Sequence, residues 1–296
     1  MKKYTMIMLC IFGYIHCIEN QAVKREPQEW DAVAYEKGSD LPTKSFLEFL
    51  DKNNIEIEEH RILDVGCGTG RLSAIYAETA EEVHAFDASE QMITFAQEKY
   101  KDKENLSFEH CFAEDFTSKK LYQLALASSA LHWVKDKKQA FEKINKSLEQ
   151  GGELFFDIRT AENRQPIALI AAGEMISEIP VVNWIISKDN IMNYIGSPYL
   201  TKEELRTMLI NANFEIIKCE EQYLQYTVTK EELKLSEWPT VTSRPIMPWV
   251  RTIFSEEKIQ YYFNKFIDRM AENMHITSGG KYVYPIDKTI VHARKK

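Results

Sequence analysis

The sequence predicts an α/β protein whose core is a doubly wound, mostly parallel sheet of about seven strands. Three observations predict this class: short apolar runs alternate with helical segments, the first run ends in a glycine-rich turn, and the alternation stops after residue 158. Parallel strands need crossover connections, and helices supply these on both faces of a sheet. Apolar runs that lack polar alternation are typical of strands buried on both faces.

The first half of the chain supplies five strands and the helices between them. A helical pattern over residues 29–50 comes first, because apolar residues recur there at helix spacing. Strands are predicted over residues 61–65, 83–86, 106–109, 124–128 and 154–158. Helices are predicted over residues 72–80, 91–100 and 137–148. This alternation favours one continuous sheet with right-handed crossovers.

The second half completes the sheet and adds helical material over one of its edges. Thr201 and Glu204 have the spacing of a capping box, so a helix is predicted to begin there. Strands are predicted over residues 214–219, 224–228 and 289–293. Residues 160–200 and 229–275 are predicted to be mainly helical insertions. Within the second insertion, the prolines of residues 238–249 predict a stiff loop.

The chain begins with a segment set apart from the predicted core. Lys2 and Lys3 precede a mostly apolar run over residues 4–18. That run is shorter than the about 20 apolar residues that span a bilayer, so it predicts a secretory signal over residues 1–19 and no stable membrane span. A buried amphipathic helix is the alternative, and a chain without a working signal is expected in the cytoplasm.

The charge balance and the cysteines narrow the classes of function. The 37 Lys and Arg residues against 45 Asp and Glu residues give a formal net charge of −8. Binding to a phosphate backbone relies on clustered Lys and Arg, so this balance disfavours a nucleic-acid partner. The five cysteines are widely spaced, without a CxxC pair or a histidine at metal spacing, so no metal site is predicted. The sequence leaves the oligomeric state open.

The strongest motif is a glycine-rich turn at the end of the first strand. The run RILDVGCGTG contains Gly66, Gly68 and Gly70, with Asp64 just before them. Glycines allow unusual backbone angles and keep side chains away from places where a ligand touches the chain. Asp87 ends the second strand, where its carboxylate can accept hydrogen bonds from two ribose hydroxyls. Ligands of such sheets bind outside the carboxyl ends of the strands.

The spacing of this turn separates two cofactor classes. Dinucleotide sites use G-x-G-x-x-G and place a pyrophosphate over a helix N-terminus. Here the spacing is G-x-G-x-G, and Asp64 repels a pyrophosphate but suits the ammonium group of S-adenosylmethionine (SAM). The motif therefore predicts SAM as the cofactor and disfavours nicotinamide-dependent oxidoreduction. A tight turn without a ligand is the alternative.

These motifs resemble those of the class I SAM-dependent methyltransferases, in particular the type 11 group. The resemblance runs over about residues 30–159 and rests on ILDVGCGTGR, FDASEQM, AED, SSALHWV and a Gly-Gly pair before the fifth strand. It implies a Rossmann-like sheet of seven strands in which Asp87 holds the ribose hydroxyls. It also implies that four further residues lie at the adenine: Ala88, Met92, Ala113 and Glu114.

Two positions depart from the pattern of this group. Phe112 stands where many relatives have an Asp that accepts from the adenine amino group. Gln123 stands where relatives have the Asp of a Phe-Asp pair before the fourth strand. Phe112 can stack on the base instead, with Glu114 or water meeting the amino group. Both departures bear on the affinity for SAM, whereas the core motif is intact.

The domain layout follows from these assignments. Residues 28–159 are predicted to form the SAM-binding core, and residues 201–228 and 276–296 to complete its sheet. Residues 160–200 and 229–275 are predicted to be insertions on the substrate side, where they form a lid.

A closer resemblance concerns the acceptor. His132-Trp133 after the fourth strand and the segment from Trp30 to Tyr35 are similar to those of trans-aconitate and juvenile hormone acid methyltransferases, which esterify small carboxylic acids. The resemblance implies that Trp133 helps to hold the acceptor carboxylate and that Tyr35 closes over the cofactor. The His132 imidazole is a second group that can orient the carboxylate. A carboxylic acid with a pKa of about 4 is ionised at neutral pH, so methyl transfer to it needs no general base.

The predicted function is therefore SAM-dependent O-methylation of a small-molecule carboxylate. The aromatic residues of the predicted insertions favour an acid with an apolar tail. Arg159 and Arg164 are further candidates for binding a charged acceptor. Two alternatives stay open. One is a SAM enzyme for a phenol, an amine or a carbon, which needs a base such as His132 or His110. The other is a non-catalytic SAM-fold binding protein.

Overall fold

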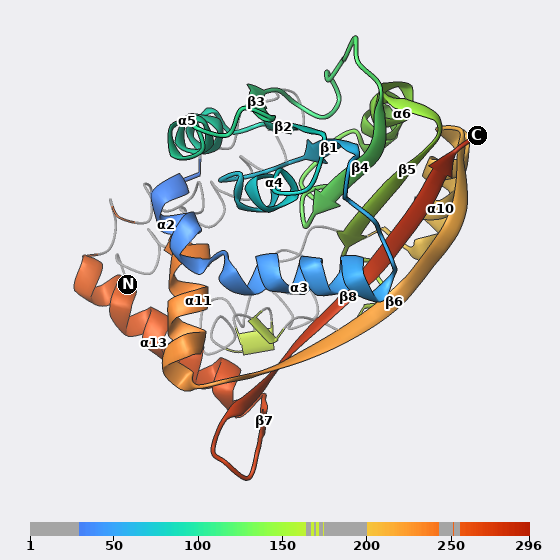
Figure 1. The fold of residues 1–296 in the computed structure, drawn as a ribbon. Coiled ribbons are helices and arrows are strands. Elements are labelled where there is room, and N and C mark those ends of the chain that lie inside the picture. The colour runs from blue at the N-terminus through green and yellow to red at the C-terminus, as the bar shows by residue number, and fades with distance from the viewer. Residues whose placement is uncertain are drawn as a thin grey trace, which may run out of the picture.

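The computed structural model of the protein describes residues 30–163, 200–242 and 255–296, together with residues 167, 168, 170, 171, 174 and 251. One sheet contains the strands β1 (Arg61–Val65), β2 (Glu82–Asp87), β3 (Leu106–His110), β4 (Tyr122–Ser128), β5 (Leu148–Ile158), β6 (Phe214–Val228), β7 (His275–Ile276) and β8 (Tyr282–Lys295). The order is β3-β2-β1-β4-β5-β8-β6, and β7 pairs with β8 beside this path (Figure 1). The predicted doubly wound α/β class is confirmed.

The chain passes through the parallel part of the sheet in two directions from β1. It moves outward from β1 to β2 and β3, then returns to β4 on the other side of β1 and continues to β5. These five strands pair in parallel, whereas β8 pairs antiparallel with both β5 and β6. The strand order therefore reverses between β1 and β4, and ligands of open α/β sheets bind at the carboxyl ends of the strands at such a reversal.

Helices cover both faces of the sheet. They are α2 (Ala32–Gly38), α3 (Asp40–Lys52), α4 (Arg71–Tyr76), α5 (Glu90–Lys99), α6 (Lys137–Ser147), α10 (Lys202–Asn211), α11 (Lys230–Thr242) and α13 (Glu256–Glu272). One buried core cluster includes Phe141 of α6 and Leu205 of α10, and a second includes Phe46 of α3. The successive β4 residues Ala125 and Leu126 belong to different clusters. Successive strand residues point to opposite faces, so each face has its own core.

Two helix starts form as the sequence predicts. At the start of α10, the Thr201 hydroxyl accepts the Glu204 N–H at 3.2 Å, and the Glu204 carboxylate accepts the Thr201 N–H at 2.8 Å. At the start of α5, the Ser89 hydroxyl accepts the Met92 N–H at 3.4 Å. Each cap satisfies a backbone donor that the first turn of a helix leaves without a partner.

β6 and β8 form a long antiparallel ribbon that extends beyond the parallel strands. β6 has 15 residues and β8 has 14, and they pair from Phe214 with Lys295 at one end to Val228 with Tyr282 at the other. The sequence predicted two short strands in place of β6. The polar residues between them continue the strand because β8 supplies backbone hydrogen-bond partners along the whole ribbon. In Figure 1 the ribbon runs from the sheet to α11 and α13.

α11 and α13 build a small additional core at the far end of this ribbon. Leu233, Phe263 and Ile267 are buried there, and the Trp238 and Phe263 rings pack edge to face with centroids 4.7 Å apart. α11 also packs against α2. The stiff loop predicted from Trp238 onward is wrong at its start, because α11 continues through Pro239. The packing of Trp238 outweighs the preference of a residue before proline for extended backbone.

Several predictions fall outside the described residues. They concern the leader over residues 1–19, Arg164, and most of the insertion over residues 160–200. None of the helices that the structure describes is long and apolar enough to cross a membrane.

Candidate active site

The glycine turn lies at the carboxyl end of β1. Gly66, Gly68 and Gly70 have φ angles of +72°, +55° and +75°, which side-chain-bearing residues rarely adopt. A Cβ atom on Gly66 would lie 2.4 Å from the Cβ of Ala130, and one on Gly70 would lie 2.6 Å from the Phe108 ring. Gly68 has more room, since the nearest atom to its Cβ position is Tyr35 Cε1 at 3.8 Å. The turn therefore packs tightly at both ends and leaves space at its middle.

Asp87 at the end of β2 is fixed beside this space. Its Oδ2 accepts the Gly68 N–H at 2.9 Å, and its Oδ1 accepts the Ser89 N–H at 2.9 Å. Burial raises the pKa of Asp87, although these two N–H donors act in the opposite direction. The carboxylate is therefore held against the glycine turn, with acceptor capacity left for hydroxyl donors of a ligand.

Asp64 lies at the other side of the turn, within β1. Its side chain is buried, and its Oδ2 accepts the Ser73 hydroxyl at 2.6 Å. Burial raises the pKa of Asp64 to about 7, the Ser73 bond opposes this rise, and the Asp87 charge adds to it. Two carboxylates thus adjoin the turn, and a cation bound there would stabilise the ionised form of both.

An aromatic cover lies over the turn. The Trp30 ring packs edge to face on Tyr35 at 5.9 Å and on Trp133 at 5.5 Å between centroids, and Trp133 lies 5.0 Å from the His132 ring. Burial, followed by the Asp87 charge, raises the pKa of Tyr35 to about 12. The structure therefore brings the predicted residues Tyr35, His132 and Trp133 together, and Trp30 joins them.

Helix α2, which carries Tyr35, is tied to the helices that flank the turn. The Glu36 carboxylate accepts Arg71 of α4 at 2.7 Å and Lys99 of α5 at 2.5 Å. Arg71 also pairs with Asp40. These ion pairs hold α2, and with it Tyr35, in position beside the turn. Partly exposed pairs of this kind contribute little to stability.

The residues predicted to lie at the adenine divide into two groups. Ala88 follows Asp87 directly, and α5, which carries the buried Met92, packs on Gly70 through Ala96. Ala113 and Glu114 are buried toward α6, and the Glu114 carboxylate accepts the Asp136 N–H at 3.2 Å. The structure thus places Ala88 beside Asp87 and Met92 on the helix that packs on the glycine turn, and it directs Glu114 toward the start of α6.

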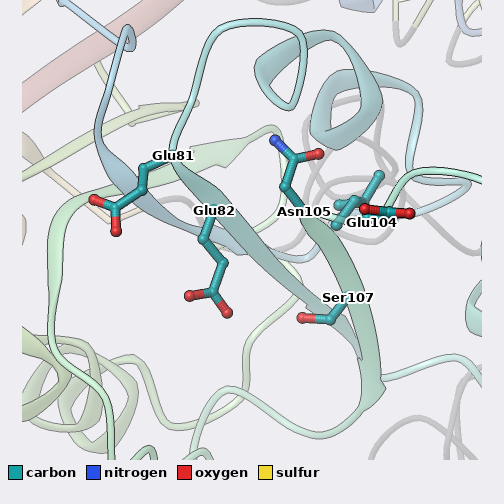
Figure 2. Close-up of a pocket in the computed structure, with 6 residues that line it drawn as sticks. Glu81, Glu82, Glu104, Asn105 and Ser107 are labelled. Carbon is teal, nitrogen blue, oxygen red and sulfur yellow. The ribbon is translucent and has the colours of Figure 1, made fainter.

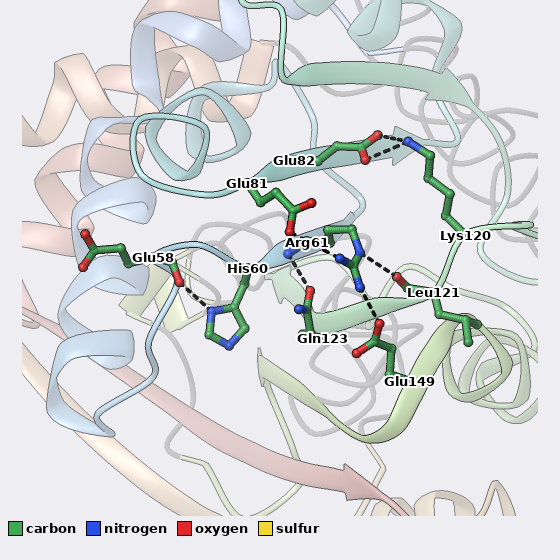
Figure 3. Close-up of polar contacts among 9 residues, drawn as sticks. All are labelled: Glu58, His60, Arg61, Glu81, Glu82, Lys120, Leu121, Gln123 and Glu149. Carbon is green, nitrogen blue, oxygen red and sulfur yellow. Dashed lines mark hydrogen bonds and ion pairs between the residues drawn. The ribbon is translucent and has the colours of Figure 1, made fainter.

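The amino-terminal edge of the parallel strands carries a hollow and a set of ion pairs. A hollow of about 300 Å³ lies there, lined by Glu81, Glu82, Glu104, Asn105, Leu106 and Ser107. Figure 2 draws these side chains as sticks. In Figure 3 the neighbouring charges pair with one another: Arg61 lies 3.3 Å from Glu81, and Lys120 lies 2.6 Å from Glu82. Gln123 accepts the Arg61 N–H at 2.7 Å at this edge. The Gln123 departure therefore lies at the edge opposite the glycine turn, away from the expected SAM site.

A polar cluster lies beside the turn, at the carboxyl ends of β4 and β5, where the middle of β8 passes. Ser129 follows β4 with a left-handed φ of +49°, and it donates to Asp157 through its N–H at 2.8 Å and its hydroxyl at 2.9 Å. The Lys288 ammonium lies 2.8 Å from the Ser129 hydroxyl and 2.9 Å from Asp157 Oδ2. Burial opposes ionisation of Asp157, but Lys288 and the Ser129 donors hold its pKa below the usual range.

His132 faces this cluster in its neutral form. Burial, followed by the Lys288 charge, lowers the pKa of His132 to about 3, and Lys137 and Arg159 act in the same direction. The buried Nδ1 atom of His132 has no hydrogen-bond partner among the described residues. A buried polar atom without a partner is costly, so His132 has an unused place for a ligand's hydrogen bond.

Sequence reasoning missed Trp30, Ser129, Asp157 and Lys288 as site residues. Asp157 carries a recognisable signal, because an acid at the end of a strand is also what identified Asp87. Lys288 carries none, since it lies 131 residues after Asp157 and reaches the site only through the antiparallel pairing of β8 with β5.

Comparisons with known proteins agree with this architecture. Residues 62–152 match the family described as the methyltransferase domain. The chain is 27% identical over 168 residues to malonyl-[acyl-carrier protein] O-methyltransferase 1 of Ilyobacter polytropus. This match covers 56% of the present chain and 57% of that protein. It is 25% identical over 227 residues to ubiquinone biosynthesis O-methyltransferase of Rickettsia canadensis, which covers 76% and 83%. The match to the Ilyobacter enzyme thus spans little more than half of that enzyme's length.

A solved structure shares the fold. The YcgJ protein of Bacillus subtilis has a TM-score of 0.51 and 17% sequence identity, covering 86% of this chain and 99% of that chain. The fold and the glycine turn together define a Rossmann-like methyltransferase domain. The family match, these relatives and the shared fold support a class I SAM-dependent methyltransferase of the type 11 group, as the motifs predict.

Proposed function

We propose that this protein transfers a methyl group from SAM to an oxygen of a small-molecule carboxylate. The observation that carries the proposal is the separation of charge across the site. Asp64 and Asp87 adjoin the glycine turn, whereas Lys288, paired with Asp157, lies beside the turn and acts on His132 together with the cations Lys137 and Arg159. A cationic cofactor suits the first side and an anionic acceptor suits the second.

The residues at the turn fit SAM in charge and shape. Asp87 can accept the two ribose hydroxyls while it keeps the Gly68 N–H in place. The free space at Gly68 lets the adenosyl group lie against backbone, and the Asp64 carboxylate suits the ammonium directly or through water. When bound, SAM supplies an electrophilic methyl group on a sulfonium, which is a good leaving group.

The remaining residues orient the acceptor rather than activate it. His132 has a pKa of about 3, so at neutral pH it is an uncharged hydrogen-bonding group and a poor general base. This favours an acceptor that is ionised without help, as a carboxylic acid is. Trp30, Tyr35 and Trp133 pack on one another over the site, with Trp133 still 53% exposed. Orientation of the reacting atoms can contribute roughly 7–11 kcal/mol to lowering the barrier.

The relatives are compatible with acceptors of this kind. The Ilyobacter enzyme is named for O-methylation of a malonyl group, which carries a free carboxylate. The Rickettsia enzyme is named for O-methylation in ubiquinone biosynthesis. Both names support an oxygen acceptor for this chain. The charged residues of its own site support a carboxylate as that acceptor. We also propose that residues 28–159 supply the SAM-binding half and that the helical insertions supply the acceptor side.

A radiolabelled assay tests the proposal. The full chain is incubated with SAM tritiated in its methyl group and with separate panels of carboxylic acids, phenols and amines. We expect label in the acid panel, in a product that mild base hydrolyses, because methyl esters are base-labile. Label only in base-stable products of phenols or amines would contradict the carboxylate, and binding of SAM without label in any panel would favour a non-catalytic SAM-fold protein.

A further inference from the structure

Lys288 is held at the carboxyl edge of the sheet by two partners. Its ammonium contacts Ser129 Oγ at 2.8 Å and Asp157 Oδ2 at 2.9 Å, and its side chain is 15% exposed. An ammonium has three N–H donors, so these two contacts leave one donor for another molecule. Ser129 is fully engaged, since its hydroxyl donates to Asp157 and accepts from Lys288.

The location of this ammonium is next to the glycine turn. Ala130, which follows Ser129, lies so close to Gly66 that a Cβ there would be 2.4 Å from its own Cβ. The Asp157 charge also acts on Tyr35, which faces Gly68. The Lys288 cluster and the proposed SAM site are therefore neighbours on one edge of the sheet.

The backbone at Ser129 is held in an uncommon conformation. Its φ of +49° lies in the left-handed region, which a serine rarely adopts. The two bonds from Ser129 to Asp157 keep it there. Strained residues held by their surroundings cluster at functional sites, and here the strain aims a hydroxyl at Lys288.

Two hydrogen-bonding positions of the protein near Lys288 are unused and can serve one ligand. The remaining Lys288 donor is one, and the buried Nδ1 of His132, without a partner among the described residues, is the other. Lys137 and Arg159 add positive charge around His132, and Asp157 adds a negative charge. A carboxylate offers two oxygens, which can accept from an ammonium and from an imidazole N–H together.

We propose that Lys288 is the residue that selects an anionic acceptor, with its ammonium bonded to one carboxylate oxygen and neutral His132 donating to the other. Ser129 and Asp157 are positioning residues that fix the ammonium. This inference rests on the proposed function, because it names the acceptor contact of the same site. It adds that acceptors are distinguished by their charge through a residue of β8, which lies outside the parallel part of the sheet.

The test uses matched pairs of acid and amide. Octanoate, cinnamate and benzoate are compared with octanamide, cinnamamide and benzamide, which keep the shape and lose the charge. Dissociation constants are measured by calorimetry on the full chain, with and without saturating S-adenosylhomocysteine, so that no turnover is needed. We expect at least one acid to bind about tenfold or more tightly than its amide, as one charge-assisted hydrogen bond implies.

Two variants give opposite expectations. Removing Lys288 alone would leave Asp157 buried without its partner, so the informative variant is the pair Asp157→Asn with Lys288→Met, which removes both charges. In this variant the preference should disappear, so that each acid and its amide bind with about equal affinity. In Asp157→Asn alone, Lys288 keeps its charge without a neutralising acid, so acid binding should become tighter. Lys295→Met, at the other end of β8 with its Nζ on the Leu148 carbonyl, is the matched control and should change neither.

Each outcome decides the proposal. Loss of acid preference in the double variant, with tighter acid binding in Asp157→Asn, supports it. The proposal is overturned by equal binding of every acid and amide in the native chain, or by a preference that survives in the double variant. Failure of S-adenosylhomocysteine to bind, while the preference for the acid remains, would instead contradict the proposed SAM function and leave Lys288 as an anion site.

Discussion

The two sides of the site carry opposite charge and are built from different kinds of sequence. At the glycine turn, burial raises the pKa of both Asp64 and Asp87, so this side favours a cation that stabilises their ionised forms. At the carboxyl ends of β4 and β5, burial and then the charges of Lys288, Lys137 and Arg159 keep His132 neutral, so this side favours an anion. In the proposed function, this difference orients the two ligands with the reacting methyl group between them.

The largest expected effect is at the anionic side. Asp87→Ala should weaken SAM binding by about 100-fold or more, because hydrogen bonds from two hydroxyls to one carboxylate are lost and each contributes about 1.5–3 kcal/mol. Calorimetry with SAM measures this effect. Glu90→Ala, an exposed acid in the first turn of α5, is the control and should bind SAM normally. Unchanged affinity in Asp87→Ala would remove the cofactor side of the comparison.

A second expectation concerns the contact that joins the two sides. Gly66→Ala should lower the free energy of unfolding by about 2–4 kcal/mol and weaken SAM binding, because its Cβ would lie 2.4 Å from Ala130 and its φ is +72°. Thermal and denaturant unfolding measure the change.

Two controls separate the clash from the backbone angle. Gly151→Ala, with φ +78° and no atom within 4 Å of its Cβ position, should cost only about 1–2 kcal/mol. Adding Ala130→Gly to Gly66→Ala should recover the part of the loss that the clash causes. Equal losses of unfolding free energy in Gly66→Ala and Gly151→Ala would show that the contact between Gly66 and Ala130 is not tightly packed.

The raised pKa of Asp64 predicts a pH dependence of cofactor binding. A cation at the turn favours ionised Asp64, so binding should release a proton below the Asp64 pKa of about 7. The affinity for SAM should therefore rise about fivefold from pH 6 to pH 7, as the ionised fraction of such an acid does. Calorimetry in buffers of different ionisation enthalpy counts the released proton. Asp64→Asn should show neither the proton nor the slope, and a native affinity that is flat over this range would contradict the assignment.

The last expectation concerns the cationic side. The folded-state pKa of His132, about 3, is below the ordinary value of 6.5, so the unfolded chain binds a proton more readily. The stabilising contribution is complete above pH 6.5 and is lost as the pH falls toward 3, with a slope of at most about 1.4 kcal/mol per pH unit. Denaturant unfolding at pH 7, 6 and 5 should show a shallower loss in His132→Asn than in the native chain. Parallel curves would mean that His132 is not held neutral.

The sequence predicted the cofactor side far better than the acceptor side. The turn residues lie within seven consecutive positions: Asp64, Gly66, Gly68 and Gly70. Their spacing alone therefore predicts both the backbone geometry of the turn and its chemistry. Asp87 could be placed because it ends the neighbouring parallel strand. In each case short-range spacing fixes the position of the side chain.

The acceptor side could not be predicted in the same way. Ser129, Asp157 and Lys288 come from three strands that meet only through sheet pairing. The sequence also divided β6 into two short strands, and so did not show the long ribbon through which β8 returns to the sheet. The position of Lys288 depends on the register of that ribbon, which no local pattern encodes.

A crystal structure of the chain with S-adenosylhomocysteine bound tests the central claim most directly. We expect the ribose hydroxyls on Asp87, the adenosyl group against Gly68, and the sulfur facing Lys288 and His132. A ligand whose ribose lies away from Asp87, or whose sulfur points away from Lys288, would contradict the opposed charges as the basis of methyl transfer.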